Sequence, residues 1–464
     1  MISFIILLIL LFVIFLLGYV VSDGDFLSPT CIASLGFIFS TLCATLNASY
    51  WGLKLETQTI DVIFVGLFVY LAVEILVKFS LFRKYKSTSS KFDSTYKVIH
   101  HIEISNTLMI ISIIGTLGVI FLYLRQVLRV ARRHGGSGSL GLMLNLYRRL
   151  SSFNVLDTRD TFPFWLNLLY VVVIGMGLFW SYIFVNNYLI EKKINLNLLL
   201  NLVLIVLSVV MNIVNANRTR MIMLAISIMV YVWFIWHRMY GWKSGVKIKT
   251  LVKIAVAVIG FIFIFFGIRN IVGRNDSRSL LYVITHYFGV PIAGLNEFLK
   301  NPVQSTIWGK ETFAGINNYI GNHYGRLDLV YSTQKEFRNI QGINIGNVYT
   351  AFRSYLHDFG FGGMLLLTAL ESLVMSTLYY SSKKRISHKI IDTKLLILPL
   401  FYYANVLLFY ADWFYEQINI SIFRMIVILL IIITFINNNS LRIGKVKLLG
   451  HKTVNNTQKE KNKP

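Results

Sequence analysis

The chain has 464 residues, of which 55% are hydrophobic and only 14% are charged. Soluble domains carry about a quarter charged residues, so this composition, with a mean hydropathy of +0.62, excludes a soluble globular fold. The net charge is +24, but the basic residues stand in short blocks between apolar runs. That arrangement is typical of membrane-protein loops and argues against a nucleic-acid-binding protein.

Apolar runs long enough to cross a bilayer occur along most of the chain. A membrane-spanning helix needs about 20 predominantly apolar residues. We therefore predict an all-α, polytopic transmembrane bundle of about eleven helices. The predicted spans are 2–21, 29–49, 60–79, 104–124, 164–188, 196–214, 220–237, 250–272, 347–380, 394–411 and 417–437. In the long 347–380 stretch, we expect the membrane to be entered near Phe359.

Four basic blocks decide the predicted orientation. They lie at 83–97, 238–253, 383–394 and after Asn439, and the count of spans places all four on one side. Because basic loops stay inside the cell, we predict that this side is cytoplasmic, with the N-terminus outside and the C-terminus inside. The loop 22–28 departs from the rule, since it contains Asp23 and Asp25 and no basic residue.

This topology divides the chain into four parts. Residues 1–272 contain the first eight helices and a long outer segment, 125–163, that is rich in arginine. Residues 273–346 form a large outer loop, residues 347–437 the last three helices, and residues 438–464 a basic cytoplasmic tail.

Arginine strongly outnumbers lysine on the predicted outer side, whereas lysine dominates the cytoplasmic loops. A guanidinium binds phosphate or carboxylate through two parallel hydrogen bonds and tolerates partial burial better than an ammonium group. The bias predicts an outer face that binds phosphate or pyrophosphate at headgroup depth. For segment 125–163, contact with lipid phosphates is an equally good interpretation. Arg218, Arg220 and Arg269 adjoin apolar spans, where a charge usually faces the protein interior and has a function.

Candidates for acid–base chemistry gather in the large outer loop and directly after it. They are Asp276, His286, Glu297, Glu311, His323 and Asp328, followed by His357 and Asp358. The sequence has no His-Glu-x-x-His zinc spacing, no Asp-x-Asp in this loop, no Gly-rich phosphate loop and no Gly-x-Ser-x-Gly elbow. We therefore expect chemistry on the outer face without a metal or other cofactor.

Two acidic residues lie inside predicted spans. Glu74 precedes Lys78 by four residues, a spacing that predicts a helical ion pair. Glu371 lies deep in the 347–380 span, where a hydrogen-bonding role and a place in a substrate groove are both open.

A resemblance to a known family is carried by the stretch from Gly346 to Gly363, GNVYTAFRSYLHDFGFGG. It resembles the Asn-x-Tyr-Thr…Asp-Phe-Gly-x-x-Gly signature of the Wzy-type oligosaccharide repeat-unit polymerases. The matching positions are Asn347, Tyr349, Thr350, Asp358, Gly360 and Gly363. His357 departs from the signature, which has a second aromatic residue before the aspartate.

Three shorter stretches are similar to further features of that family. Leu27-Ser28-Pro29 precedes the second span, and Asn215-Ala-Asn-Arg218-Thr opens a later helix. Tyr287-Phe-Gly with Ala293-Gly-Leu-Asn-Glu297 resembles the start of the family's large periplasmic loop. In topology, the resemblance extends over the whole chain.

The resemblance implies a GT-C-like helical fold and a metal-independent glycosyltransferase in the bacterial inner membrane, with its N-terminus in the periplasm. The donor would be a growing glycan on undecaprenyl pyrophosphate, and the acceptor would be the non-reducing end of one lipid-linked repeat unit. Its partners would be a chain-length regulator, a flippase and a ligase. Nucleic acid is not an expected partner.

The resemblance also orders the candidate site residues. Asp358 is the first expected general base, although a turn or helix-capping role beside Gly360 explains it equally well. Glu297, His286 and His323 follow as alternatives. The expected pyrophosphate ligands are Arg218, Arg220, Arg269, Arg353, Arg274 and Arg278.

Two alternative functions remain at this point. An O-antigen ligase would use the same donor but transfer the glycan to the lipid A core, and the 346–363 motif favours the polymerase over it. A flippase for the lipid-linked unit would belong to a different class. Its family has more even, short loops and an internal repeat, whereas this chain has one long outer loop and no repeat.

Overall fold

The computed structural model describes residues 1–82, 99–152, 160–215, 217–242, 260, 278–331, 334–384 and 391–438, with short pieces at 442–443, 446–447 and 449–454. Within these ranges the chain is mainly helical, and nine helices are long and apolar enough to cross a membrane. They confirm a multi-pass helical membrane protein. The predicted span 250–272 lies outside the described residues except for Gly260. The predicted span 394–411 forms a shorter helix, α14 (Thr393–Val406), with Pro399 inside it.

The chain divides into two compact units that we describe separately. Unit 1 contains residues 1–85, 276–382 and 400–422, and unit 2 contains residues 86–275, 383–399 and 423–464. The predicted division into four consecutive parts therefore differs from the division by contacts. Helix α14 contributes its first half to unit 2 and its second half to unit 1.

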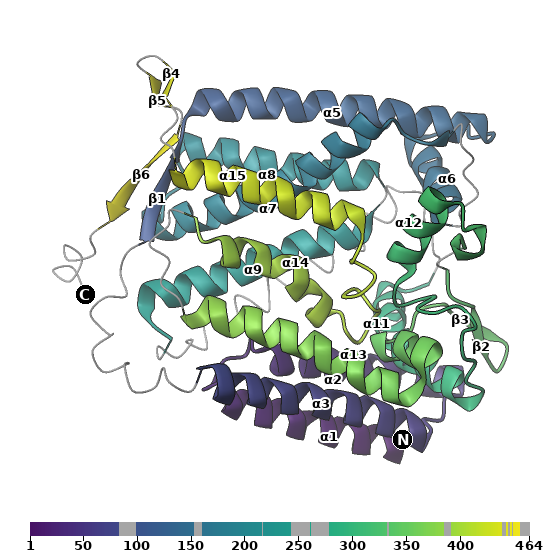
Figure 1. The fold of residues 1–464 in the computed structure, drawn as a ribbon. Helices are drawn as coiled ribbons and strands as arrows, with labels where there is room; N and C mark the ends of the chain where they lie inside the picture. The colour runs from purple at the N-terminus through teal and green to yellow at the C-terminus, as the bar shows by residue number, and fades with distance from the viewer. Residues whose placement is uncertain are drawn as a thin grey trace. The chain divides into compact units, whose positions relative to one another are not determined.

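Unit 1 is built on α1 (Ile2–Val21), α2 (Pro29–Trp51), α3 (Thr57–Phe82) and α13 (Ala351–Lys384), which lie side by side (Figure 1). Helix α2 begins where the sequence dictates, because the Ser28 side chain accepts a hydrogen bond from the backbone of Cys31 and Pro29 occupies the first turn. It ends at Gly52, which has a φ of 65°. Phe352 of α13 packs against Phe37 of α2 with ring centroids 5.4 Å apart.

The predicted outer loop 273–346 is largely folded. It forms α11 (Leu280–Lys300), α12 (Ala314–Tyr324), the short helix η3 (Leu327–Leu329), and the hairpin of β2 (Arg338–Ile340) and β3 (Ile343–Gly346). Helix α11 packs closely on α2, and a Cβ at Gly289 would lie 2.7 Å from the backbone nitrogen of Ala44. Helix α11 was not predicted as an apolar span, because it contains polar residues such as His286 and Asn296.

Helix α13 breaks at Gly360, which has a φ of 65° and a ψ of −168°. Only glycine adopts this region readily, because it has no Cβ. The break separates a first segment, 351–359, from the apolar remainder of the helix. The break lies next to Phe359, and the entry of the chain into the membrane there stays a prediction.

The two aspartates of loop 22–28, between α1 and α2, form hydrogen bonds with side chains of α3 and α13. The Asp23 carboxylate accepts a hydrogen bond from Lys78 at 2.8 Å, and Asp25 accepts one from the hydroxyl of Tyr379. Glu74 accepts hydrogen bonds from the backbone of Thr30 at 2.7 Å and from Tyr380 at 2.9 Å. The predicted Glu74–Lys78 pair is therefore wrong, because the loop between α1 and α2 supplies a closer carboxylate for Lys78.

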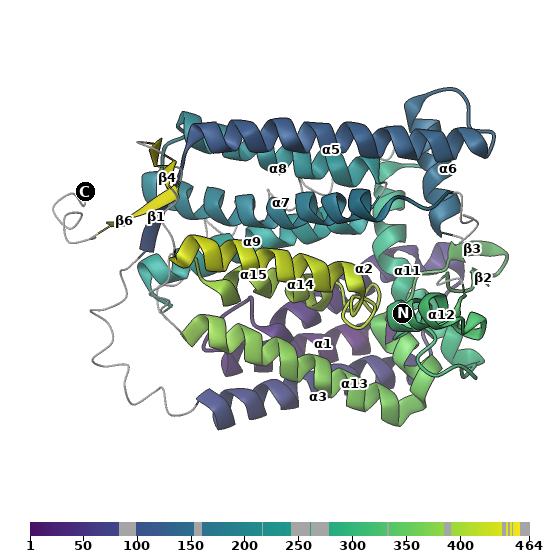
Figure 2. The same ribbon diagram turned by 45° about the horizontal axis from the view of Figure 1, so that its top comes forward.

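Unit 2 contains a second group of long helices, α5 (Asn106–Arg133), α7 (Phe164–Glu191), α8 (Leu196–Val214), α9 (Arg218–Tyr240) and α15 (Ile420–Asn438), with the shorter α6 (Leu140–Ser152) (Figure 2). Helices α7 and α8 approach closely, since Ser208 donates a hydrogen bond to the carbonyl of Val173 at 3.0 Å. Asn217 caps α9 by accepting a hydrogen bond from the backbone of Arg220. This confirms that the Asn215–Thr219 turn opens a helix.

The remaining elements of unit 2 are short strands. β1 (Ile99–Ile104) pairs antiparallel with β6 (Leu449–Val454), and β4 (Arg442–Ile443) pairs with β5 (Val446–Lys447). Arg125, Arg129 and Arg132 lie in the last turns of α5, where all three are exposed. Their exposure agrees with the interpretation that they contact lipid phosphates.

Candidate functional site

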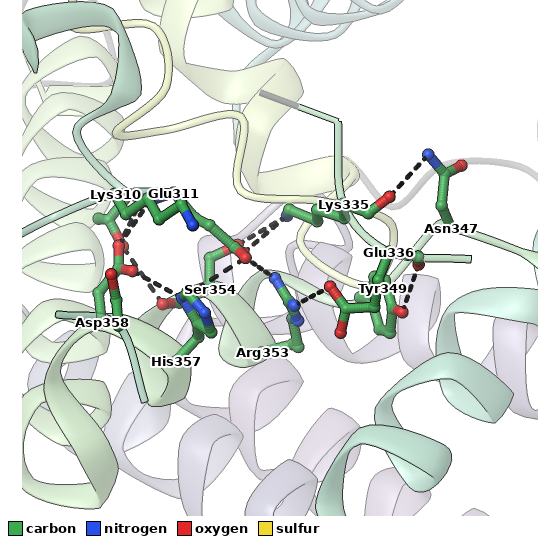
Figure 3. Close-up of polar contacts among 12 residues, drawn as sticks. Lys310, Glu311, Lys335, Glu336, Asn347, Tyr349, Arg353, Ser354, His357 and Asp358 are labelled. Atoms are coloured by element: carbon green, nitrogen blue, oxygen red, sulfur yellow. Dashed lines mark hydrogen bonds and ion pairs between the residues drawn. The ribbon is translucent and has the colours of Figure 1, made fainter. Parts of the chain in front are cut away.

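The first turns of α13 carry a buried arginine at the centre of a charged cluster in unit 1. Arg353 is 1% exposed. Its guanidinium pairs with Glu311 on one side and with Glu336 at 2.5 Å on the other (Figure 3). The faces of the guanidinium lie 4.9 Å from the ring of Phe298 and 4.6 Å from the ring of Tyr349. Arg353 is thus held by two carboxylates and two aromatic rings, which fix its position.

Lys335 extends the cluster. Its ammonium group donates to the Ser354 hydroxyl at 2.7 Å and lies 3.8 Å from Glu311 and 4.0 Å from Glu416. The Ser354 hydroxyl in turn donates to Glu311 at 3.2 Å. Glu311 therefore accepts contacts from Arg353, Lys335 and Ser354, and it links the segment between α11 and α12 to α13.

His357 and Asp358, one turn after Arg353, form a hydrogen-bonded pair. The Nδ1 atom of His357 lies 2.9 Å from Asp358 Oδ1 and 3.5 Å from Glu311 Oε1. Two carboxylates at Nδ1 assign the proton of the neutral ring to that nitrogen, which leaves Nε2 as an acceptor. Within the described part of the chain, Nε2 has no hydrogen-bond partner.

The Asp358 carboxylate is completely buried and also holds the backbone of the segment between α11 and α12. Its Oδ2 atom accepts hydrogen bonds from the backbone nitrogens of Glu311 at 2.9 Å and Thr312 at 2.7 Å. Both of its oxygens are therefore engaged within the protein. This places Asp358 behind His357 as a positioning group, and makes His357 the stronger candidate for a base.

Two motif residues fix the segment that carries Glu336. The amide of Asn347 donates to the carbonyl of Lys335 at 3.3 Å, and the hydroxyl of Tyr349 donates to the carbonyl of Glu336 at 2.7 Å. The signature positions before α13 therefore hold the strand-like segment 334–338 over the helix start. Thr350 is buried at the beginning of α13.

The two arginines beside Glu336 keep its carboxylate ionised. Burial opposes ionisation, but the charge of Arg353 and the hydrogen bonds from Arg338 and Arg353 lower the pKa of Glu336 to about 2. Arg338 donates to Glu336 at 2.8 Å. The carboxylate is thus an anion at every physiological pH.

A pocket of about 280 Å³ opens beside this cluster. It is lined by Val303, Glu336, Phe337, Arg338, Arg353 and His357. Its wall combines an imidazole, a carboxylate, two guanidiniums and an aromatic ring. Such a mixture of donors, acceptors and one flat apolar surface suits a small polar ligand with several hydroxyl groups.

The other predicted bases do not join this pocket. His286 packs against Trp51 and lies 3.3 Å from the hydroxyl of Tyr282. Glu297 pairs with Lys300 at 2.6 Å. His323 stacks on Tyr319 with ring centroids 4.0 Å apart. The structure accounts for each of these three side chains by contacts within its own helix or with α2.

The predicted pyrophosphate arginines are only partly described. Arg269 and Arg274 lie outside the described residues, as does the side chain of Arg218. Arg220, in unit 2, contacts the sulfur of Met223 at 3.7 Å, and Arg278, in unit 1, lies over the ring of Tyr282 at 5.1 Å. Arg353 is already neutralised by two carboxylates, so its geometry favours a structural role over phosphate binding.

Sequence reasoning missed Lys335 and Glu336, which belong to the site. Neither stands in a recognisable motif, and both reach Arg353 and Ser354 only because Asn347 and Tyr349 fix their segment. The signal that pointed toward them was indirect, namely the signature residues that bind their backbone.

Comparison of this chain with family models, curated proteins and solved structures gave no match. The case for a function therefore rests on the residues of the motif and on the geometry of the pocket beside it.

Proposed function

We propose that the protein is a membrane glycosyltransferase that joins oligosaccharide repeat units carried on undecaprenyl pyrophosphate. In this proposal the growing glycan is transferred to the non-reducing end of a new lipid-linked unit. The observation that carries it is the His357–Asp358 pair, which lies inside the polymerase-like motif and borders the pocket. On the predicted orientation this pocket faces the periplasm.

The pair supplies what the transfer requires of the acceptor. A hydroxyl attacks an anomeric carbon efficiently only if a base removes its proton during the attack. A neutral imidazole with its Nδ1 hydrogen held by a carboxylate has its other nitrogen ready to accept that proton. Nε2 of His357 would take the proton as the acceptor oxygen forms the new glycosidic bond.

The bond that breaks joins the anomeric carbon to the pyrophosphate oxygen. Undecaprenyl pyrophosphate leaves with the bonding electrons, and its oxygen gains negative charge. Guanidiniums aimed at that oxygen would stabilise the transition state. Arg278 is the candidate that belongs to unit 1 together with the pocket, since Arg353 is occupied by Glu311 and Glu336. For Arg218, Arg220, Arg269 and Arg274 the role rests on the sequence alone.

The pocket supports an acceptor sugar as its ligand. Glu336 and the guanidinium of Arg338 offer an acceptor and donors to sugar hydroxyls, and Phe337 offers an apolar surface to the face of a ring. A pyrophosphate would meet the carboxylate of Glu336 at the same place, which repels it. We therefore place the acceptor sugar, and not the phosphates, in this pocket.

The test is the surface-glycan ladder of a deletion strain complemented with wild type, His357→Ala or Arg326→Ala. Arg326 is the control because it is exposed and pairs only with its neighbour Asp328 among the described residues. Loss of a general base slows transfer by about 10²- to 10⁴-fold. We expect wild type and Arg326→Ala to restore the ladder, and a normally expressed His357→Ala to leave a core with one repeat unit.

Other outcomes point to the alternative functions. A deletion that leaves bare core would favour the ligase. Accumulation of lipid-linked units on the cytoplasmic side would favour the flippase. A full ladder from His357→Ala would refute the role of this histidine as the base.

A further inference from the structure

Unit 1 contains a second polar cluster, deeper than the pocket and separate from it. It consists of Tyr355 and Glu371 of α13 and Asp412 of the 407–419 segment, and all three are 0% exposed. The Tyr355 hydroxyl lies 2.9 Å from Glu371 Oε2 and 3.3 Å from Asp412 Oδ1. A hydroxyl has one hydrogen, so it donates to one of these carboxyl groups at a time.

The second oxygen of each carboxyl group is buried without a partner. Glu371 Oε1 and Asp412 Oδ2 have no hydrogen-bond partner in the described part of the chain. Two further buried hydroxyls beside Glu371, those of Thr368 and Tyr70, are also unpartnered. The hydroxyls do not hydrogen-bond either carboxyl group, so no described donor reaches Glu371 Oε1 or Asp412 Oδ2. Buried polar atoms are nearly always satisfied, so these two carboxyl oxygens call for a hydrogen of their own.

The groups around the two carboxyls do not neutralise them. Tyr70 faces Glu371 from α3, and Tyr415 lies near both carboxyls from the 407–419 segment. The cation that influences Asp412 is Lys335, which is itself shared by Glu311 and Glu416. Among the described residues, no lysine, arginine or histidine pairs with Glu371 or Asp412.

Two ionised carboxylates bridged by a single hydroxyl would repel each other in apolar surroundings. A buried charge without a partner is also far more costly than a buried neutral acid. Burial, with the charges of Glu416 and Glu371, raises the pKa of Asp412 well above its usual range. The backbone nitrogen of Tyr415, which donates to Asp412 Oδ1 at 3.0 Å, and the charge of Lys335 oppose this rise in pKa but do not cancel it.

We infer that Glu371, Tyr355 and Asp412 form a proton-binding site, in which at least one proton is held between the two carboxyl groups in the resting protein. This site lies outside the pocket, and it does not depend on the proposed glycosyl transfer.

The segment that carries Asp412 also reaches the charged cluster around Arg353. The 407–419 segment also carries Glu416, which lies 4.0 Å from Lys335, and Lys335 donates to Ser354 beside Arg353. Release of the proton would add a negative charge four residues before Glu416. The added charge would draw Lys335 away from Glu311, so the occupancy of the buried site would be linked to the charge balance at the pocket.

The test uses the purified full-length protein and dicyclohexylcarbodiimide, an apolar reagent that couples to protonated carboxyl groups. Adducts are located by peptide mass spectrometry at neutral pH. Glu74 is the internal comparison because it is equally buried, while both of its oxygens accept hydrogen bonds, from Thr30 and Tyr380. We expect an adduct at Glu371 or Asp412 and little at Glu74.

A second measurement does not depend on access of the reagent. The infrared spectrum of the wild type should contain a carbonyl band of a protonated carboxylic acid that is reduced in Glu371→Gln or in Asp412→Asn. Absence of both the adduct and the band difference would overturn the proposal. Equal labelling of Glu74, or protection of Glu371 by sodium or potassium ions, would also overturn it, because the reagent would then report burial or a metal ion would occupy the site.

Discussion

Arg353→Met should destabilise unit 1 strongly. The substitution keeps most of the apolar length of the side chain but removes a charge that is 1% exposed. It leaves the carboxylates of Glu311 and Glu336 facing an apolar group. Removal of one partner from a buried ion pair costs about 3–5 kcal/mol. Loss of the contacts with Phe298 and Tyr349 adds about 0.5–2 kcal/mol for each ring.

The pairing energy is isolated by a double-mutant cycle. Much of the cost of Arg353→Met arises from the carboxylates left without a partner, so Glu311→Gln in the same chain should return part of it. We expect the double variant to lose less stability than the two single variants lose together, with a coupling free energy of about 0.5–3 kcal/mol. The measurement is the unfolding midpoint of the detergent-purified protein in a denaturing detergent, followed by tryptophan fluorescence.

The control is Arg326→Met. Arg326 pairs with Asp328 on the surface, where both side chains are more than half exposed. Solvent screens such a pair, so this substitution should leave the midpoint unchanged. If the effects of Arg353→Met and Glu311→Gln simply add, the two side chains do not interact in solution, and our account of the buried cluster is refuted.

Three further predictions concern stability. The lowered pKa of Glu336 stabilises the fold at pH values above about 4.5, its ordinary pKa, and this contribution should fade as the pH falls toward 2. The thermal unfolding midpoints of wild type and Glu336→Gln should therefore converge in acid, and a constant difference would contradict the assignment. In the same assay, Gly360→Ala should lower the stability by about 1–3 kcal/mol, because Gly360 has a positive φ. The control is Gly362→Ala, where an added Cβ would meet no atom within 4 Å, and it should be neutral or stabilising. Equal effects of the two substitutions would argue against the break in α13. Gly289→Ala should lower the stability by about 1–3 kcal/mol, because the added Cβ would force α11 away from α2. Gly118→Ala is the control, since a Cβ at Gly118 would lie in open space. A Gly289→Ala variant as stable as wild type would show that the two helices are not in close contact.

The spans were predictable because a lipid environment imposes a simple rule on composition. Apolar runs of about 20 residues gave α1, α2, α3, α5, α7, α8, α9, α13 and α15 to within a few residues at most of their ends. The rule failed for α11, which is buried mainly by contact with α2 and carries polar residues that bond to neighbouring segments. Asn296, for example, accepts a hydrogen bond from the Thr59 hydroxyl at 2.9 Å. Such partners are 237 residues apart in the chain, and periodicity within one segment does not reveal them.

The site was predictable only at the motif. Asp358 was identified as a base by its place in the matched motif, but its carboxylate is used to hold the backbone of residues 311 and 312. The neighbouring His357, which departs from the expected pattern, has the free ring nitrogen. The sequence could not show which of these two residues is the base and which is the positioning group. That depends on which side chain faces residues 311 and 312 and which one faces the pocket.

Unit 1 is also assembled from the first and nearly the last parts of the chain. The hydroxyl of Tyr402 donates to the carbonyl of Leu27, and Asn405 donates to the carbonyl of Pro29 at 3.0 Å. The Asn405 contact joins positions 376 residues apart. During synthesis, α1, α2 and α3 therefore enter the membrane long before their partners exist, while the ribosome makes most of unit 2. A chain that stops before residue 402 lacks both of these side chains, so the carbonyls of Leu27 and Pro29 wait for their partners until synthesis is nearly finished.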